Sequence, residues 1–110
     1  MPKAVMVVLS GPSDPSREDE YNEWYGNVHV PEVCAIPGFV GARRFKVSDA
    51  GLSPVDATAP AYLAIYELDS EDIAATCKEV MVRAGDGRIH MSDALSMDPP
   101  PSMVVYEALD

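Results

Sequence analysis

The sequence predicts a single α+β domain in which two helices cover one face of a four-stranded antiparallel sheet. The chain has 110 residues, the length of one domain, and 47% of them are hydrophobic. Four short apolar segments and two segments with helical periodicity follow one another in the order β-α-β-β-α-β. This order is typical of the ferredoxin-like arrangement. We therefore expect one domain over residues 1–110.

The first strand and the first helix follow from clear patterns. Residues 4–9 are an apolar run, rich in β-branched side chains, that ends at a serine-glycine-proline turn, and this predicts a strand. Acidic residues then precede side chains at helical spacing, from Tyr21 to Val28, which predicts a helix over 17–30. Because Pro31 lacks the N–H group that would continue the helix, we expect an end or a kink there, after which the helix can restart as a turn through Cys34.

The second and third strands flank a loop. Residues 38–47 predict a strand whose basic side chains suit an edge position: Arg43, Arg44 and Lys46. Residues 48–60 contain glycine, proline and aspartate and predict a loop. Residues 61–66 are almost continuously apolar and predict the third strand.

A second helix precedes a segment that is harder to interpret. Apolar residues over 73–84 form its inner stripe, with Asp69 or Ser70 as the expected cap and Gly85 just beyond its end. Residues 87–102 include three consecutive prolines, which predict a stiff extended spacer.

Residues 103–106 predict the fourth strand. Strands one, three and four lack polar alternation, so both of their faces should be buried. Two helices can cover only one face of the sheet, and a second copy of the same sheet is the simplest cover for the other. We therefore expect a homodimer with the two sheets face to face.

Charge and composition exclude several classes of function. With 18 acidic and 8 basic residues, the formal charge is −10, which disfavours binding to nucleic acids and to anionic membranes. No apolar run approaches the roughly 20 residues that span a bilayer, and the N-terminus lacks the pattern of a signal peptide. The two cysteines, Cys34 and Cys77, form no disulfide or metal pattern. We expect a protein of the reducing cytoplasm.

One histidine on the first helix is a candidate for acid–base chemistry. His29 falls one turn after Tyr25, at the edge of the buried stripe, and Asn22 lies on nearly the same line two turns earlier. An imidazole there can act as general acid or base near neutral pH. The alternative is a structural histidine that binds a backbone carbonyl near Pro31.

The same segment resembles a known family. The run Trp24 to Glu32 reads W-Y-G-N-V-H-V-P-E, and Ile36 to Phe45 reads I-P-G-F-V-G-A-R-R-F. Together they resemble the EthD-like family of dimeric α+β barrel proteins. The resemblance implies a homodimer, a pocket between sheet and helices, and His29 as the leading functional residue. Relatives in the superfamily include isomerases, cyclases, dehydratases and oxygenases. Phe45 stands where the family often has tyrosine, so no hydroxyl is expected there.

Other candidates come from the strands. Arg43 and Arg44 are neighbours, so one should face the cavity and could bind a carboxylate or enolate, whereas both could instead be solvated edge charges. Tyr62 and Tyr66 share one face and could supply hydroxyl groups or serve as core aromatics. The residues expected to bind substrate are Trp24, Tyr25, Asn22, Arg43, Arg44, Tyr62 and Tyr66.

A metal site is a weaker alternative. His29 with Glu32 and His90 with Asp93 could supply two nitrogens and two oxygens. Nothing in the sequence brings the two segments together, so we expect neither a metal nor another cofactor.

These patterns favour a cofactor-independent enzyme. We expect proton transfer of the isomerase, lyase or cyclase type on a small hydrophobic metabolite that is cyclic or bears a carbonyl, with His29 as general acid or base. The alternatives are a non-catalytic protein that binds a small ligand, or a cofactor-independent or haem-degrading oxygenase.

Overall fold

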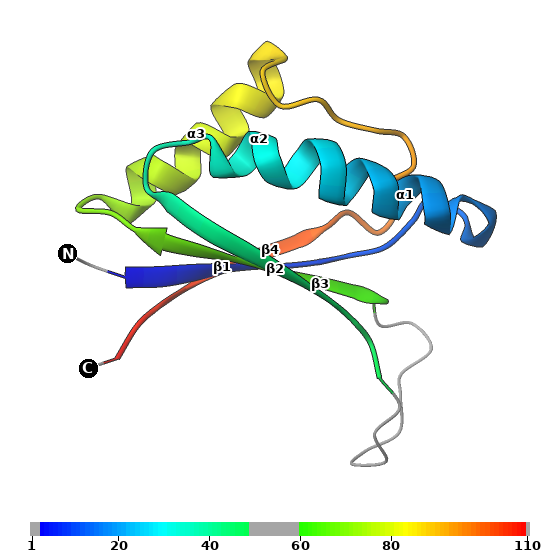
Figure 1. Cartoon of the computed structure of the whole chain (residues 1–110), viewed down its shortest axis with the longest axis horizontal. Coiled ribbons are helices and arrows are strands. Elements are labelled where there is room, and N and C mark those ends of the chain that lie inside the picture. Colours follow the sequence, from blue (N-terminus) through cyan, green and yellow to red (C-terminus); the bar gives the residue numbers. More distant parts are fainter. Residues whose placement is uncertain (1–2, 49–59, 110) are drawn as a thin grey trace.

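The sheet has the predicted topology. The structure is a computed structural model that describes residues 3–48 and 60–109. Its strands pair antiparallel in the order β2-β3-β1-β4 (Figure 1). The strands are β1 (Lys3–Ser10), β2 (Phe39–Lys46), β3 (Tyr62–Asp69) and β4 (Ser102–Glu107). The prediction that β2 is an edge strand is confirmed, whereas almost all of the predicted loop 48–60 lies outside the described residues.

One continuous helical rod connects β1 to β2. The helix does not end at Pro31 but continues through Cys34, the residue to which the sequence allowed a restarted turn. The rod comprises η1 (Pro15–Arg17), α1 (Glu18–Trp24), the π turn η2 (Tyr25–His29) and α2 (Val30–Cys34). In η2, the Val30 N–H bonds to the Tyr25 carbonyl five residues earlier. A π turn widens the helix directly before Pro31, whose ring would otherwise clash with the carbonyl four residues earlier.

The second helix, α3 (Ile73–Asp86), is confirmed with corrected ends. Its cap is Asp72, whose side chain accepts a hydrogen bond from the Ala75 N–H at 3.0 Å. Ser70, an expected cap, instead bonds the Thr76 hydroxyl at 2.7 Å. The helix ends at Gly87, two residues later than expected, in a left-handed conformation (φ 88°) that glycine adopts without strain.

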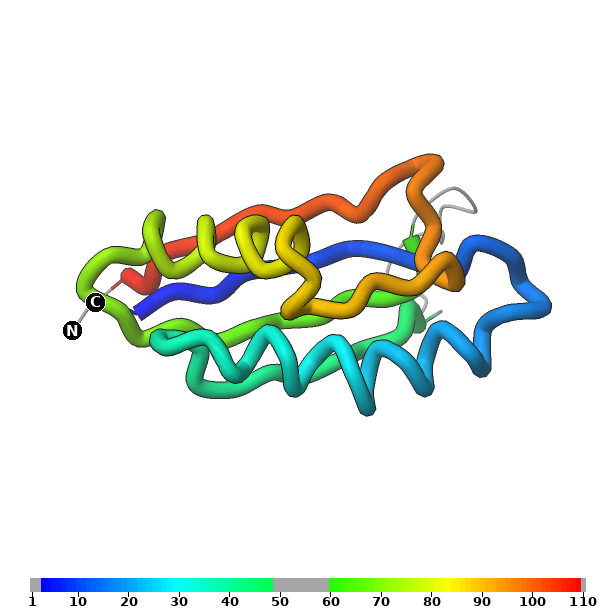
Figure 2. The backbone as a smooth tube through the Cα atoms, turned by 90° about the horizontal axis from the view of Figure 1, so that it is seen from above, coloured from blue at the N-terminus to red at the C-terminus, as the bar shows by residue number. Residues whose placement is uncertain are grey.

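The helical rod and α3 both cover the same face of the sheet (Figure 1). Viewed from above, the rod and α3 lie over the sheet, and the chain after α3 continues alongside the rod before it turns back into β4 (Figure 2). This connection, residues 87–101, is called the strap below. It contributes buried apolar side chains to the core: Ile89, Ala94 and Leu95.

The turn into β2 fixes the rod against α3. Gly38 has a φ of 103°, and a Cβ atom at this position would lie 2.8 Å from Cγ2 of Thr76. Only glycine permits both this backbone conformation and this close approach.

The outer face of the sheet remains uncovered. On β1, Met6 and Val8 face the helices and are buried, whereas Val5 and Val7 face outward and are half-buried. Every residue of β4 is exposed, so the prediction that both of its faces are buried is wrong for the single chain. The cause is position, because β4 forms the sheet edge and its outer face has no cover. None of the described helices is long and apolar enough to span a membrane.

Candidate functional site

A cavity of about 230 Å³ lies between the sheet and the helices, under the strap. Met6 and Val8 of β1 and Tyr66 of β3 form its floor, and residues of the rod, α3, the strap and β4 complete its walls. Val7 and Leu9 of β1 belong to the outer face of the sheet and do not line the cavity. The strand register places Met6, Val8 and Ser10 inward.

Four lining residues bring polar side-chain atoms to this apolar cavity: Ser10, Tyr25, His29 and Tyr66. Ser10 Oγ is already paired with the Tyr21 hydroxyl at 2.6 Å. In contrast, His29 Nδ1 and the Tyr66 hydroxyl are buried without a hydrogen-bond partner within the described chain. Buried polar atoms are rarely left unpaired, so these two atoms are candidates to bind a ligand.

His29 is held by aromatic rings. Its imidazole stacks on Trp24, with ring centroids 4.8 Å apart, and meets the Tyr25 ring edge-on at 5.0 Å. Burial lowers the pKa of His29 to about 4, and the charge of Arg44 acts in the same direction while Glu32 opposes it. The imidazole is therefore neutral at pH 7.

The two lining tyrosines are neutral hydrogen-bond donors. Burial raises the pKa of Tyr25 and that of Tyr66. The nearby Tyr25 hydroxyl raises the pKa of Tyr66 further, although the two hydroxyls are not in hydrogen-bonding geometry. Both phenols can donate a hydrogen bond to a ligand oxygen, but neither readily gives up its proton.

The structure distinguishes the two arginines. Arg44 faces the helices, where its guanidinium lies 4.3 Å from the centroid of the Tyr25 ring and donates to Asn22 Oδ1 at 2.8 Å. Arg43 is on the outer face, 5.0 Å above the Phe45 ring. Of the two arginines, Arg44 is the one near the cavity. It packs against the Tyr25 ring but does not itself line the cavity.

Two further predicted residues belong to this supporting network. Asn22 Nδ2 donates to the Tyr62 hydroxyl at 3.1 Å, and that hydroxyl donates to Glu18 Oε2 at 2.7 Å. Asn22, Tyr62 and Trp24 do not line the cavity. Of the predicted substrate-binding residues, only Tyr25 and Tyr66 do.

The strap is fastened to the rod by polar contacts. One Glu32 oxygen accepts a hydrogen bond from the His90 backbone N–H at 2.7 Å, and the other lies 2.5 Å from His90 Nδ1. The Trp24 indole donates to the His90 carbonyl at 3.0 Å, and Arg17 pairs with Asp93 at 2.6 Å. These contacts hold the strap in place over the cavity.

The two segments that carry the candidate metal ligands are therefore in contact. Even so, the described part of the chain contains no cluster of three or more histidine, cysteine or acidic residues that could hold a metal ion. The thiols of Cys34 and Cys77 are free, and burial raises the pKa of each.

The main feature that the sequence did not reveal is the large share of methionine in the cavity lining. Five of the six methionines in the chain line the cavity: Met6, Met81, Met91, Met97 and Met103. Four of them fall within residues 81–103, and this local concentration was the available signal. Ser10 was also missed, because it was assigned to a turn.

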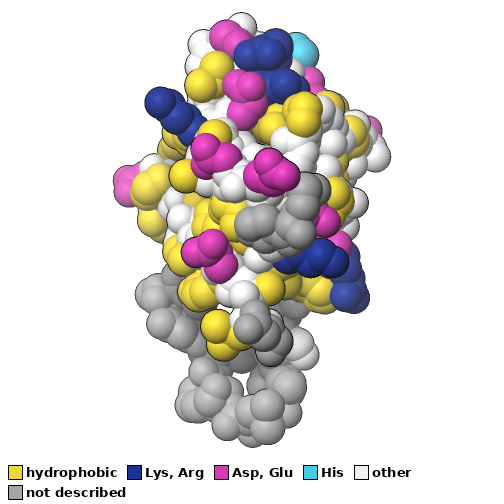
Figure 3. Space-filling model, turned by 90° about the vertical axis from the view of Figure 1, so that its left-hand side faces the viewer, with side chains coloured by type: hydrophobic (Ala, Val, Ile, Leu, Met, Phe, Trp, Pro, Cys, Tyr) yellow, Lys and Arg dark blue, Asp and Glu magenta, His cyan; other side chains and the backbone are white. Residues whose placement is uncertain are grey.

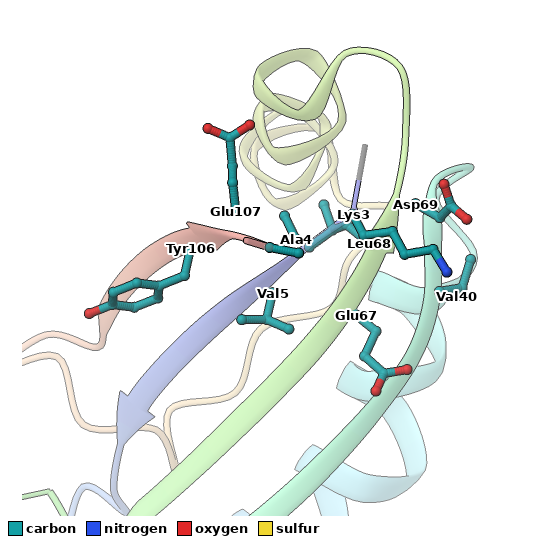
Figure 4. Close-up of a pocket in the computed structure, with 10 residues that line it drawn as sticks. Lys3, Ala4, Val5, Val40, Glu67, Leu68, Asp69, Tyr106 and Glu107 are labelled. Atoms are coloured by element: carbon teal, nitrogen blue, oxygen red, sulfur yellow. The ribbon is translucent and has the colours of Figure 1, made fainter. Parts of the chain in front are cut away.

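A second hollow, of about 390 Å³, lies where β1, β3 and β4 meet near the chain ends (Figure 4). Its polar residues are mostly acidic, including Glu67, Asp69 and Glu107, with Lys3 as the basic one. Figure 3 looks at this end of the molecule and shows carboxylates scattered among apolar side chains. The hollow lacks histidine, so the cavity beside His29 is the better candidate for catalysis.

Comparison with solved structures identifies the fold. The chain resembles an ethyl tert-butyl ether degradation (EthD) family protein from Bacillus halodurans C-125, with a TM-score of 0.62 and 17% identity over 99% of this chain and 100% of that one. It resembles a candidate monooxygenase from Shewanella loihica PV-4, with a TM-score of 0.59 and 16% identity over 100% and 98% of the two chains.

A third similar structure is a dimeric ferredoxin-like protein of unknown function from Thermobifida fusca YX, with a TM-score of 0.55 and 19% identity over 97% and 92% of the chains. The chain thus has the ferredoxin-like α+β fold. The resemblance to the EthD-like family is supported at the level of that fold. No family model and no curated protein matches the sequence.

Proposed function

We propose that this protein catalyses proton transfer on a small hydrophobic carbonyl compound without a cofactor, with His29 as the general base. The observation that carries this proposal is a neutral imidazole in the wall of an apolar cavity that is also lined by Tyr66, whose hydroxyl is unpaired. A base and a hydrogen-bond donor on one cavity are the minimal equipment for enolisation.

In the proposed reaction, the His29 imidazole takes a proton from the carbon next to the carbonyl. The hydroxyls of Tyr25 and Tyr66 donate hydrogen bonds to the carbonyl oxygen as negative charge develops on it. The nearby carboxylate of Glu32 favours the imidazolium once it forms. The imidazolium then returns the proton to carbon or oxygen, a step shared by isomerases, cyclases and lyases.

The direct test is hydrogen–deuterium exchange at the carbon next to the carbonyl, followed by proton NMR in D₂O for a panel of cyclic and aryl ketones. We expect exchange above the buffer rate for members of the panel. His29→Gln should lower it by roughly 10²–10⁴-fold, while Glu23→Gln, at an exposed position of the same rod, should not. Exchange that is equal in wild type and His29→Gln would overturn the proposal.

A second candidate function is ligand binding without turnover. A pKa of about 4 makes His29 a weak base, which favours this alternative. Ketones that bind in the cavity without any exchange would establish it. The oxygenase alternative is supported only by the description of the Shewanella loihica structure.

We further propose that the protein is a homodimer of the cytoplasm. The Thermobifida fusca relative is described as dimeric, and the outer sheet face carries exposed or half-buried apolar side chains: Val5, Val7, Leu9, Leu63, Ile65, Val104 and Tyr106. A second sheet would cover them. The free thiols of Cys34 and Cys77 fit a reducing compartment.

A further inference from the structure

Four methionines that line the cavity beside His29 are also exposed to solvent. Met81 comes from α3, Met91 and Met97 from the strap, and Met103 from β4. Their exposed fractions are 60%, 51%, 64% and 48%, so each thioether borders both the cavity and solvent. These four residues are called the methionine rim below. Side chains from α3, the strap and β4 thus combine apolar cavity lining with exposure to solvent.

The cavity contains no site for an ionised group. None of the aspartate, glutamate, lysine or arginine residues within 3–48 and 60–109 lines this cavity. Arg44, the nearest candidate, is engaged by Asn22 and by the face of the Tyr25 ring. Burying an unpaired charge is costly, so the buried end of a ligand should be uncharged.

The size of the cavity indicates that a ligand extends beyond it. Its volume of about 230 Å³ is below the range of roughly 300–1,000 Å³ that is usual for small-molecule pockets. The rim continues the apolar surface outward from this space. Methionine is flexible and polarisable, so a rim built from it can adapt to apolar groups of different shape.

We propose that the natural ligand is an uncharged compound with a carbonyl end and an extended apolar tail. The carbonyl end lies against His29 and Tyr66, and the tail leaves the cavity between the four methionines of the rim. The choice of the carbonyl end rests on the proposed function, whereas the neutral charge and the tail rest on the cavity lining and the rim.

The first part of the test compares two matched series in isothermal titration calorimetry. The 4-alkylacetophenones carry a neutral carbonyl end, and the 4-alkylbenzoates place a carboxylate at the same end. For the ketones, we expect affinity to rise about fourfold for each methylene that reaches the rim. We expect each benzoate to bind at least tenfold more weakly than the ketone with the same alkyl group. Benzoates that bind as tightly as the ketones would overturn the inference of a neutral ligand.

The second part uses rim variants. Met91→Gln and Met97→Gln keep the side-chain length but add a polar amide, and Val82→Gln changes an exposed residue of α3 outside the cavity. The two rim variants should flatten the dependence of affinity on chain length while leaving the shortest ketone unaffected, and the control should change neither. All three positions are exposed, and thermal unfolding followed by circular dichroism checks the fold.

The outcomes separate this inference from the proposed function. The inference of an apolar tail at the rim is wrong if affinity does not rise with alkyl chain length, or if it rises as steeply in the rim variants as in the wild type. This holds even when short ketones still exchange deuterium. If longer ketones bind through the rim but no ketone exchanges deuterium, the ligand class stands and the proposed catalysis fails.

Discussion

His29 is the residue on which the proposed chemistry depends, and its neutral state is a consequence of burial. The aromatic rings of Trp24 and Tyr25 replace water around the imidazole. Among the described residues, no carboxylate or other group forms a hydrogen bond with its Nδ1. The nearby charge of Glu32 compensates only partly, so the pKa falls to about 4. The sequence located this residue through helical spacing, but the sign of the pKa change depends on packing that spacing does not reveal.

This pKa predicts how stability depends on pH. In the unfolded chain His29 titrates near its ordinary value of 6.5, so below that pH the unfolded state binds the proton first. The contribution of His29 to the free energy of unfolding should be constant above pH 6.5 and should fall between pH 6.5 and 4. His29→Gln should remove this part of the acid sensitivity in urea unfolding at pH 7.5, 5.5 and 4.5. Equal acid sensitivity in both proteins would contradict the burial of His29.

The two buried tyrosine hydroxyls should respond in opposite ways to removal. Tyr66→Phe deletes a hydroxyl without a partner in the described residues, so it should leave the free energy of unfolding unchanged or raise it by about 1 kcal/mol. Tyr21→Phe deletes the bond to Ser10 and should cost about 1–2 kcal/mol. Urea unfolding measures both. A Tyr66→Phe variant that is as destabilised as Tyr21→Phe would show that the Tyr66 hydroxyl has a structural partner.

At the scale of elements, strand positions and their order were predictable because apolar runs and turn residues are local signals. The passage of the helix through Pro31 was not, because a π turn is a local adjustment that residue preferences do not encode. Nor was the strap, since its contacts to Glu32 and Arg17 join residues 58 and 76 positions apart. The inward choice of Arg44 over Arg43 likewise needed the register of β2 against β3.

The contacts of Glu32 should hold the strap in place. Glu32→Ala removes the acceptor of the His90 N–H, so hydrogen exchange at that amide should become at least about tenfold faster, as expected for loss of a bond to a charged group. The control is Glu23→Ala, at an exposed position of the same rod. Amide exchange followed by NMR measures both variants. Unchanged exchange at His90 in Glu32→Ala would mean that packing alone fixes the strap.

At the scale of the whole molecule, the uncovered outer face explains why the prediction that both faces of β1, β3 and β4 are buried is not met in a single chain. The inner face is covered by helices from the same chain, and the outer face carries apolar side chains that no other described part of the chain covers. An order of elements shows which face the helices occupy, but not which surface a second molecule takes.

Val7 tests the proposed dimer. It lies on the outer face between Ile65 of β3 and Val104 of β4. Val7→Asp would bury an unpaired carboxylate between two sheets, so the dimer should dissociate. Val82→Asp, at an exposed position of α3, is the matched control and should leave the dimer intact. Sedimentation equilibrium gives the mass. A wild-type monomer, or a stable Val7→Asp dimer, would contradict the face-to-face arrangement.

The measurement that tests the central claim most directly is the pH dependence of deuterium exchange on a bound ketone, compared with the NMR titration of the His29 ring in the free protein. If His29 is the base and its pKa is about 4, kcat/KM for deuterium exchange should stay level from pH 8 to about 5 and should fall only as the pH approaches 4. The same midpoint should appear in the His29 titration. A rate that falls with a midpoint near 6.5, or a midpoint that differs from that of His29, would contradict the claim that this buried neutral imidazole is the catalytic base.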